Sequence, residues 1–248
     1  MSGGIDIRGV EFRYPDGRKA LHGVDLEIAP GERVAILGPN GAGKTTLALQ
    51  LNGILQPQVG TISISGIPVV AEHYREVRRR VGLVFQDAND QLFMPTVRED
   101  VAFGPANLGL EGDALEQRVA AALEVVSGSE FADRPPHHLS GGEKRRAALA
   151  TVLSMEPDVL VFDEPTSGLD PAGRRELIRT LAELPMTQIV ITHDLPLALE
   201  LCPRSVIMNG GRVVADVPTE SLLAAPSLLA ENRLELPYGF DRSEPPSS

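Results

Sequence analysis

Hydrophobic and polar positions along the chain follow two patterns, and both predict β-strands. Alternation of apolar and polar residues predicts half-buried strands, and it covers Ile5–Tyr14, Leu21–Ile28 and Thr61–Gly66. Short apolar runs predict strands buried on both faces, as in a parallel sheet. Such runs occur at Arg33–Leu37, Val81–Phe85 and Val159–Phe162, and a further strand is expected at Gln188–Thr192.

Helices are expected between most of these strands. The predicted helices are Thr46–Asn52, Tyr74–Arg80, Val97–Leu108, Ala114–Val126, Ser140–Met155, Gly173–Glu183, Leu195–Leu201 and, interrupted near Pro226, Leu222–Leu234. Ser205–Met208 and Arg212–Asp216 predict a closing hairpin around Asn209-Gly210-Gly211. We therefore expect one α/β domain over residues 1–236, with a mostly helical subdomain inserted at about 87–150. The tail 237–248 is expected to be disordered.

Composition narrows the class of protein. The chain has 248 residues, a formal net charge of −11 and a single cysteine, Cys202. An acidic chain is a poor match for a nucleic-acid binder, which needs a basic face. A lone cysteine cannot form an internal disulfide, which agrees with a reducing cytosol. No apolar run approaches the length of a membrane span, and no secretory signal is evident at the N-terminus.

A glycine-rich loop lies between the predicted strand Arg33–Leu37 and the helix that follows it. Gly38-Pro39-Asn40-Gly41-Ala42-Gly43-Lys44-Thr45 fits the phosphate-binding pattern G-x-x-x-x-G-K-[ST] in the strand–loop–helix context that this motif requires. Glycines allow successive N–H groups to point inward, and the helix N-terminus adds positive potential. Lys44 then brings a full charge to the β- and γ-phosphates, and Thr45 offers a hydroxyl to Mg²⁺. The competing interpretation is a glycine-rich turn with a surface lysine.

Two carboxylates follow the apolar strand Val159–Phe162. Asp163 and Glu164 lie at a strand's C-terminal end, which is where α/β sheets bind ligands. In a nucleotide site Asp163 would hold Mg²⁺, and Glu164 would act as the general base that polarises the attacking water. Without the phosphate loop, two solvated acids before the turn at Pro165 would be the simpler interpretation.

A second pair of glycines begins another predicted helix. In Leu139-Ser140-Gly141-Gly142-Glu143, N–H groups and the helix dipole again face an anion. One nucleotide needs only one such cradle, so the second cradle suggests a site that serves the nucleotide of another subunit.

The chain resembles the nucleotide-binding subunit of ATP-binding cassette (ABC) transporters over roughly residues 5–216, because it carries these motifs in the order and spacing of that family. The resemblance implies a P-loop NTPase fold with a RecA-like core, an antiparallel β subdomain and a helical subdomain. It implies ATP and Mg²⁺ as ligands, with Thr46 belonging to the phosphate-loop segment. It also implies a second ABC ATPase subunit, identical or paralogous, that closes head to tail over two nucleotides.

The resemblance assigns further roles residue by residue. Tyr14 stacks on adenine, or alternatively is a core strand aromatic. Gln86 contacts Mg²⁺ and signals to the membrane partner, while Asp170 links the two sites. His193 is the switch histidine near the γ-phosphate, although a lone histidine is more often structural. Ser140, Gly141, Gly142 and Glu143 contact the nucleotide across the dimer interface; the family commonly has Gln where this chain has Glu143.

Within the family, the chain is most similar to the ATPases of energy-coupling factor and cobalt/nickel transporters. Val84–Phe93 and the stretch that continues through Pro105 carry this likeness, with support from Leu139–Arg146. It implies a peripheral protein at the cytoplasmic face of the membrane, whose Gln86–Pro105 region contacts a transmembrane subunit. The cargo would be cobalt, nickel or a vitamin. Alternatively, Leu92, Phe93 and Met94 merely fill the core of the smaller lobe.

Two other functions remain in competition. A soluble ABC ATPase that acts on DNA or ribosomes would be expected to carry a long coiled coil or a second cassette, and this chain has neither. A regulatory cassette without hydrolysis is disfavoured by the intact Lys44, Asp163, Glu164 and His193. His137-His138 is a poor metal chelate, because no third ligand is nearby.

Overall fold

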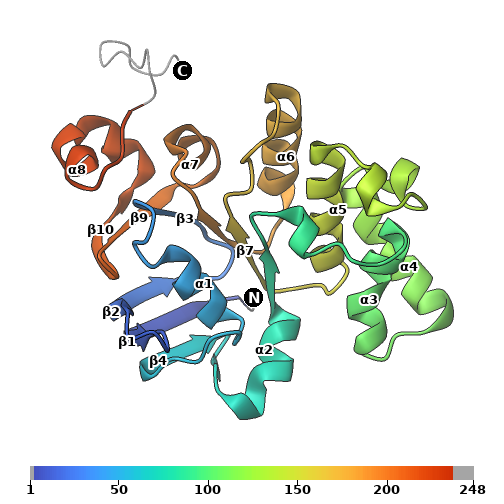
Figure 1. Ribbon diagram of the computed structural model, residues 1–248, viewed down its shortest axis with the longest axis horizontal. Helices are drawn as coiled ribbons and strands as arrows, with labels where there is room; N and C mark the ends of the chain where they lie inside the picture. Colours follow the sequence, from blue (N-terminus) through green and yellow to red (C-terminus); the bar gives the residue numbers. More distant parts are fainter. Residues whose placement is uncertain (1–2, 237–248) are drawn as a thin grey trace.

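The computed structural model describes residues 3–236, which form two β-sheets and a separate group of helices (Figure 1). The predicted disordered tail, 237–248, lies outside the described residues. An antiparallel sheet, a mostly parallel sheet and a helical group are the three parts that the resemblance to ABC ATPases implies.

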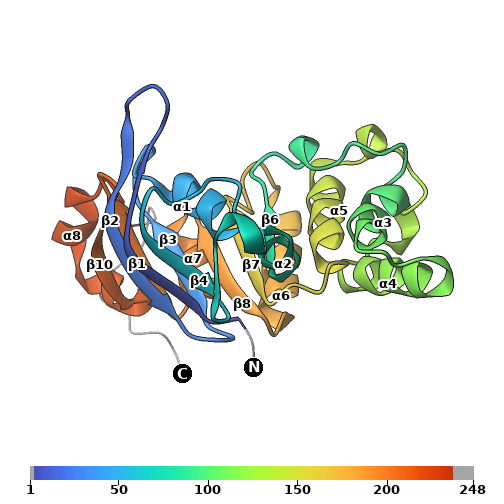
Figure 2. The same cartoon turned by 90° about the horizontal axis from the view of Figure 1, so that it is seen from below.

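The first sheet is antiparallel and has the strand order β2-β1-β4-β5. Its strands are β1 (Ile5–Arg13), β2 (Lys19–Ile28), β4 (Val59–Ile64) and the short β5 (Ile67–Pro68). Alternate residues of β1, such as Ile5 and Ile7, are buried, as the alternation in the sequence predicts. The β1–β2 hairpin extends beyond the rest of the molecule (Figure 2).

The second sheet has the order β10-β9-β3-β8-β7-β6 and is parallel except for β10. Its strands are β3 (Arg33–Leu37), β6 (Val81–Val84), β7 (Val159–Asp163), β8 (Thr187–Ile191), β9 (Arg204–Asn209) and β10 (Arg212–Pro218). The predicted closing hairpin is confirmed, since β9 and β10 pair antiparallel. Nearly every residue of the central strands is buried, because helices or the first sheet cover both faces.

Eight α-helices are present among residues 3–236. They are α1 (Lys44–Leu51), α2 (Tyr74–Arg80), α3 (Val97–Asn107), α4 (Gly112–Val125), α5 (Gly141–Leu153), α6 (Pro171–Glu183), α7 (Leu195–Leu201) and α8 (Pro226–Glu231). Short 3₁₀ turns, which the sequence patterns did not predict, lie at Ala71–His73, Ala88–Asp90, Ser129–Phe131, Pro136–His138 and Thr219–Ala224. None of the helices in this range is both long and apolar enough to cross a bilayer.

Helices α3, α4 and α5 pack on one another beside the β6–β7 edge of the second sheet (Figure 1). Val101, Val119, Leu123 and Leu149 are buried in their shared core. Thr96 caps α3 through a reciprocal capping box with Glu99. The apolar core of the helical group is continuous with one face of the second sheet, and α5 is the helix that reaches the sheet edge.

The expected tail helix at Leu222–Leu234 is wrong in extent, although its interruption near Pro226 is confirmed. The chain forms a 3₁₀ turn at Thr219–Ala224 and a six-residue helix at Pro226–Glu231. Proline disfavours helical backbone in the residue before it, and Ala225 has φ −119° and ψ 57°. The proline therefore ends the first element and begins the second, rather than kinking a single helix.

Candidate nucleotide-binding site

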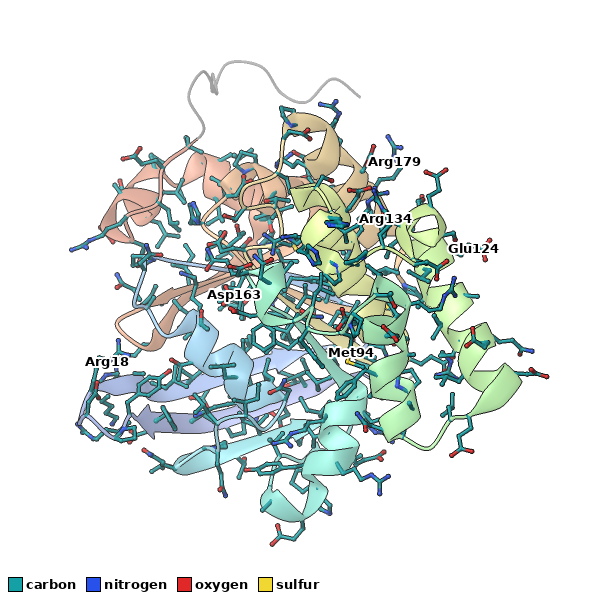
Figure 3. The ribbon with its side chains drawn as sticks, turned by 45° about the vertical axis from the view of Figure 1, so that its right-hand side comes forward. Arg18, Met94, Glu124, Arg134, Asp163 and Arg179 are labelled. Carbon is teal, nitrogen blue, oxygen red and sulfur yellow. The ribbon has the colours of Figure 1, made fainter. Side chains whose placement is uncertain are left out.

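Three strands of the parallel sheet end at the same level. Ile191 pairs with Ile36 on one side and with Asp163 on the other, so the carboxyl ends of β3, β8 and β7 are in register. The segments that follow these strands are the glycine loop, the Thr192–His193 pair and Glu164. Because ligands of parallel α/β sheets bind at this edge, the register brings the phosphate loop, Asp163, Glu164 and His193 to one place. Asp163 lies near the middle of the molecule, between α1 and the helical group (Figure 3).

The glycines of the phosphate loop are required for two different reasons. A Cβ on Gly38 would lie 2.0 Å from the carbonyl oxygen of Met208, and one on Gly43 would lie 2.7 Å from that of Ala20. A Cβ on Gly41, in contrast, would meet no atom within 4 Å, but Gly41 has a φ of +80°, which favours glycine. Two glycines therefore allow close packing against β9 and β2, and the third allows the loop to turn over an open space.

Lys44 is 7% exposed although it carries a charge. Its Nζ donates hydrogen bonds to the carbonyl oxygens of Gly38 at 2.6 Å and Pro39 at 3.0 Å. Burial lowers the pKa of Lys44, while the nearby charges of Glu164 and Asp163 act in the opposite direction. A buried ammonium group with only carbonyl oxygens as bonded partners is a favourable environment for an incoming phosphate.

Thr45 and Asp163 meet across the site. The hydroxyl of Thr45 donates to Asp163 Oδ2 at 2.7 Å. Burial raises the pKa of Asp163; the charge of Glu164 acts in the same direction, and the Thr45 bond opposes both. A hydroxyl and a carboxylate are the oxygen donors that Mg²⁺ uses together with substrate phosphates, so the residues present fit this ion.

Asp163→Asn is expected to raise the thermal unfolding midpoint at pH 7 by about 1–3 °C, while ATP turnover falls. Burial raises the pKa of Asp163 in the folded state. The carboxyl group therefore contributes its full stability below its unfolded pKa of about 4, and this stability is lost as the pH rises through the folded-state pKa. The stabilisation by asparagine should therefore shrink as the pH falls toward 4. Calorimetry at several pH values measures this.

The matched control for that comparison is Asp170→Asn. Asp170 is exposed, and its carboxylate accepts the N–H of Gly173 as the N-cap of α6 at 2.7 Å. Asparagine caps helices about as well as aspartate, so this variant should leave the unfolding midpoint unchanged. A gain in stability that is equal in both variants, or that persists unchanged at low pH, would contradict the explanation by burial.

Glu164 is held by the residues that follow β8. Its Oε2 accepts the hydroxyl of Thr192 at 3.0 Å, and its Oε1 accepts the backbone N–H of His193 at 3.1 Å. The Nδ1 of His193 lies 2.6 Å from the same Oε1. Glu164 also has a φ of +48°, a left-handed conformation that costs energy in a residue with a side chain. The structure thus brings Glu164 and His193 into direct contact, with a strained backbone at the residue that carries the carboxylate.

Tyr14 lines a cavity of about 500 Å³ together with residues of the phosphate loop, Asp163, Glu164 and His193. Its hydroxyl is bonded to that of Thr46 at 3.0 Å, and its ring is nearly perpendicular to the Phe12 ring, with centroids 5.0 Å apart. The guanidinium of Arg18 lies 4.9 Å from the centre of the Tyr14 ring. Tyr14 is therefore not a wholly buried core residue. The exposed Arg18 side chain covers one face of its ring, and has to move away before a base can stack on that face.

The second glycine pair is at the start of α5, as predicted. Ser140 is the N-cap, and Glu143 Oε2 accepts the Ser140 N–H at 2.8 Å, completing a capping box that also contacts Arg134. A Cβ added to Gly141 or to Gly142 would meet nothing within 4 Å. Packing within the chain thus gives no reason for glycine at either position.

Within one chain, most of this α5 segment lies apart from the phosphate loop. Ser140, Gly142 and Glu143 line a cavity of about 360 Å³ together with Asp170, and none of them lines the cavity that holds Lys44. Gly141 lines a third cavity, of about 540 Å³, which it shares with Thr45 and Asp163. Gln86 is exposed and lines both this cavity and the one around Lys44.

Four polar residues that hold the site or the neighbouring 85–94 segment were not singled out from the sequence. Thr192 holds Glu164, and Arg145 donates to the carbonyl of Gln86. Gln91 ties its loop to α5, and the buried Asp100 accepts the N–H groups of Phe93 and Met94. Arg145 and Asp100 could have been found from the sequence, because each is a charged residue at a position where the helical periodicity predicts burial.

Comparison with known proteins decides the family. The family model described as ABC transporter matches residues 21–167. The chain belongs to the ABC transporter ATP-binding family. It is 60% identical, over 96% of its length and 91% of the relative's, to a putative ABC transporter ATP-binding protein of Streptomyces coelicolor. It is also 45% identical, over 96% of its length and 78% of the relative's, to the energy-coupling factor transporter ATP-binding protein EcfA of Methanothermobacter thermautotrophicus.

Solved ABC structures agree with the fold. CbiO1 from Clostridium perfringens, described as part of the ABC transporter complex cbiONQ, has a TM-score of 0.82 and 38% identity, and the match covers 96% of this chain and 97% of CbiO1. The cassette MJ0796, in a dimeric post-hydrolysis state with ADP and phosphate, has a TM-score of 0.77 and 28% identity over 87% of this chain and 98% of its own. This ABC protein is an ATPase that binds ATP, and its relatives favour transport over an action on DNA or ribosomes.

Proposed function

We propose that this chain is the ATP-hydrolysing subunit of an energy-coupling-factor-type importer for cobalt, nickel or a vitamin. The proposal includes a peripheral position at the cytoplasmic face of the membrane and an ABC ATPase domain over residues 1–236 with its helical subdomain at about 87–150. The likeness to EcfA and CbiO1 supports it. Its structural support is an exposed pair of aromatic side chains, Phe93 and Phe103, in the segment that follows the Gln86 loop.

Phe93 and Phe103 form this pair on the outside of the helical group. They are 64% and 44% exposed, and their rings meet edge to face with centroids 5.0 Å apart. Leu92, in contrast, is buried, so the alternative of a core role holds for Leu92 and not for Phe93. Large exposed aromatics on a defined turn are typical of a protein contact site.

Hydrogen bonds to α3 and α5 hold the turn that presents Phe93. Asp100 is 3% exposed, and its Oδ1 accepts the N–H groups of Phe93 and Met94, both at 3.0 Å. Gln91 donates from Nε2 to the carbonyl of Ala148 on α5 at 2.7 Å. A force applied to the turn by a membrane subunit therefore reaches α5 through bonds and not through a loose loop. This supports Gln86–Pro105 as the region that contacts the transmembrane partner.

The catalytic roles follow from the site. The N–H groups of Gly38–Thr45 and the Lys44 ammonium bind the triphosphate and counter its charge. Glu164 accepts a proton from the attacking water and orients it, and His193, which is bonded to Glu164, lies near the γ-phosphate. Tyr14 stacks on adenine, and Thr46 fixes its ring through the hydroxyl bond. Catalysis on this account is mainly positioning and charge stabilisation.

Mg²⁺ would be held by Thr45 and Asp163, with Gln86 contacting it from the loop that leads to the membrane partner. When bound, it would neutralise charge on the β- and γ-phosphates. The Thr45–Asp163 hydrogen bond of 2.7 Å supports this assignment, because it brings the two oxygens next to each other.

A second copy of the chain, or a paralogue, would complete the site. Ser140, Gly141, Gly142 and Glu143 of one subunit would contact the nucleotide held by the Lys44 loop of the other, and Asp170 would link the two sites. The open space around Gly141 and Gly142 supports this arrangement, because glycines at a helix start leave N–H groups accessible to an anion.

The docking role predicts the effect of Phe93→Ser. This variant should lose most transport and most binding to the membrane subunit, while ATP hydrolysis by the isolated chain changes less than about twofold, since Phe93 does not line the cavity around Lys44. Val125→Ser, which removes another apolar side chain that is 48% exposed on the helical group, is the matched control. Equal loss in both variants would argue against a specific contact at Phe93.

Uptake measurements test the proposed function as a whole. A strain that lacks the chain should fail to accumulate one of radiolabelled cobalt, nickel or a vitamin, and the wild-type gene should restore uptake while the Glu164→Gln gene should not. Affinity purification from detergent-solubilised membranes should recover an integral membrane protein. Recovery of ribosomes or DNA without a membrane protein would overturn the proposal.

A further inference from the structure

Arg145 is a buried arginine whose bonds all go to the backbone of other segments. It is 7% exposed and lies in the first half of α5. Its Nη1 donates to the carbonyl oxygens of Phe85 at 3.1 Å and Gln86 at 2.5 Å, and its Nη2 donates to that of Ser167 at 3.0 Å. Burying a charge is costly unless it is paired or hydrogen-bonded, and these three bonds offset part of that cost.

The three carbonyls belong to two segments that face the nucleotide. Phe85 and Gln86 begin the loop that lines both cavities around Thr45. Ser167 directly precedes Gly168-Leu169-Asp170, and Asp170 caps α6. The helix that carries Arg145 itself begins at the Ser140 glycine pair. One side chain thus contacts the Gln86 loop and the segment before α6 from the helix that starts at Ser140.

The bond to Ser167 differs from the other bonds of the Gln86 loop. Lys144 donates to Asn89 at 2.9 Å, and Gln91 donates to the Ala148 carbonyl at 2.7 Å; both bonds tie the loop to α5. Arg145 also ties the loop to α5, through its bonds to Phe85 and Gln86. In addition, its planar guanidinium bonds to Ser167, which belongs to the segment before α6. The guanidinium therefore makes the link from the loop and α5 to the residues that lead into α6.

We propose that Arg145 is a positioning residue for ATP hydrolysis, which couples the Gln86 loop and the 167–170 segment to α5. A shift of α5 then moves both segments together, and the cavity of about 540 Å³ that these elements line gives them room to move. This inference rests on the proposed roles of Gln86, Ser140 and Asp170 in the nucleotide site. It adds a residue that binds neither nucleotide nor metal and acts through the segments it holds.

The test compares Arg145→Met, Arg145→Lys and the control Arg179→Gln in the full chain. Methionine fills a similar volume without a donor, and lysine keeps a charge but cannot span both segments with a fork. Arg179 is exposed on α6 at the edge of the molecule, away from Asp163 (Figure 3). In Arg145→Met we expect kcat to fall roughly tenfold or more, with KM and the Kd of a fluorescent ATP analogue within about twofold. Arg145→Lys should be intermediate, and Arg179→Gln should match the wild type.

Hydrogen exchange provides a readout that does not depend on turnover. Amides of residues 85–91 and 167–170 should exchange at least about fivefold faster in Arg145→Met than in the wild type, while those of β3 and β8 do not change. The inference is overturned if these amides and kcat stay unchanged, or if exchange rises throughout the chain, which would indicate general destabilisation. If the wild type hydrolyses ATP no faster than Glu164→Gln, the proposed catalytic site fails, and the exchange result still decides the role of Arg145.

Discussion

Replacement of Glu164 by glutamine should lower steady-state ATP hydrolysis by about a hundredfold or more, with ATP binding retained. Glutamine has the same shape and can still bond to Thr192 and His193, but it cannot accept the proton of the attacking water. The left-handed backbone at Glu164, with a φ of +48°, supports a position maintained for chemistry and not for stability. A phosphate-release assay and equilibrium binding of ATP measure the two effects separately.

The matched control for Glu164→Gln is Thr192→Ser, which keeps the hydroxyl that donates to Glu164 Oε2. Its turnover should stay within about threefold of the wild type. Lys44→Ala should instead lose ATP binding itself, because it removes the charge that the loop surrounds. Unchanged hydrolysis by Glu164→Gln would refute the assignment of the base.

Replacement of Gly142 by aspartate should leave the fold intact but lower ATP turnover on the order of a hundredfold. The new Cβ meets no atom within 4 Å, and a negative charge in the first turn is favourable to α5. The unfolding midpoint should therefore equal or exceed that of the wild type. If a triphosphate held by another chain approaches this turn, the added charge repels it.

Gly142→Ala separates size from charge, because it adds only the Cβ. It should reduce turnover less than Gly142→Asp, and both variants should bind ATP as monomers with an unchanged Kd, since Gly142 does not line the cavity around Lys44. Full activity of Gly142→Asp would mean that the glycine pair does not face a nucleotide.

The sequence predicted the fold well where one local rule dominated. The apolar runs of β3, β6 and β7 and the glycine loop before α1 were recognised because a buried parallel strand and a phosphate loop each have a strong local pattern. The interruption of the tail helix near Pro226 was predicted, but its extent was wrong, because the residues before the proline form a 3₁₀ turn and the helix after it ends at Glu231. The two-residue strand β5 was missed because it is too short to show a period.

Contacts across the site were harder to predict than the motifs. The chain order separates Glu164 from Thr192, and Arg145 from Ser167, and no local pattern states that these residues meet. The register of Ile191 with Ile36 and Asp163 explains the first pair, because it aligns three strand ends. The second pair depends on how α5 lies against the sheet edge, which depends on the packing of the whole helical group.

The central claim is that ATP is held between two chains, and sedimentation of the hydrolysis-deficient Glu164→Gln protein with saturating ATP tests it most directly. We expect an ATP-dependent dimer with two nucleotides bound, and a monomer that still binds ATP when Gly142→Asp is added to the same protein. A Glu164→Gln protein that stays monomeric at saturating ATP, or a double variant that dimerises equally well, would contradict it.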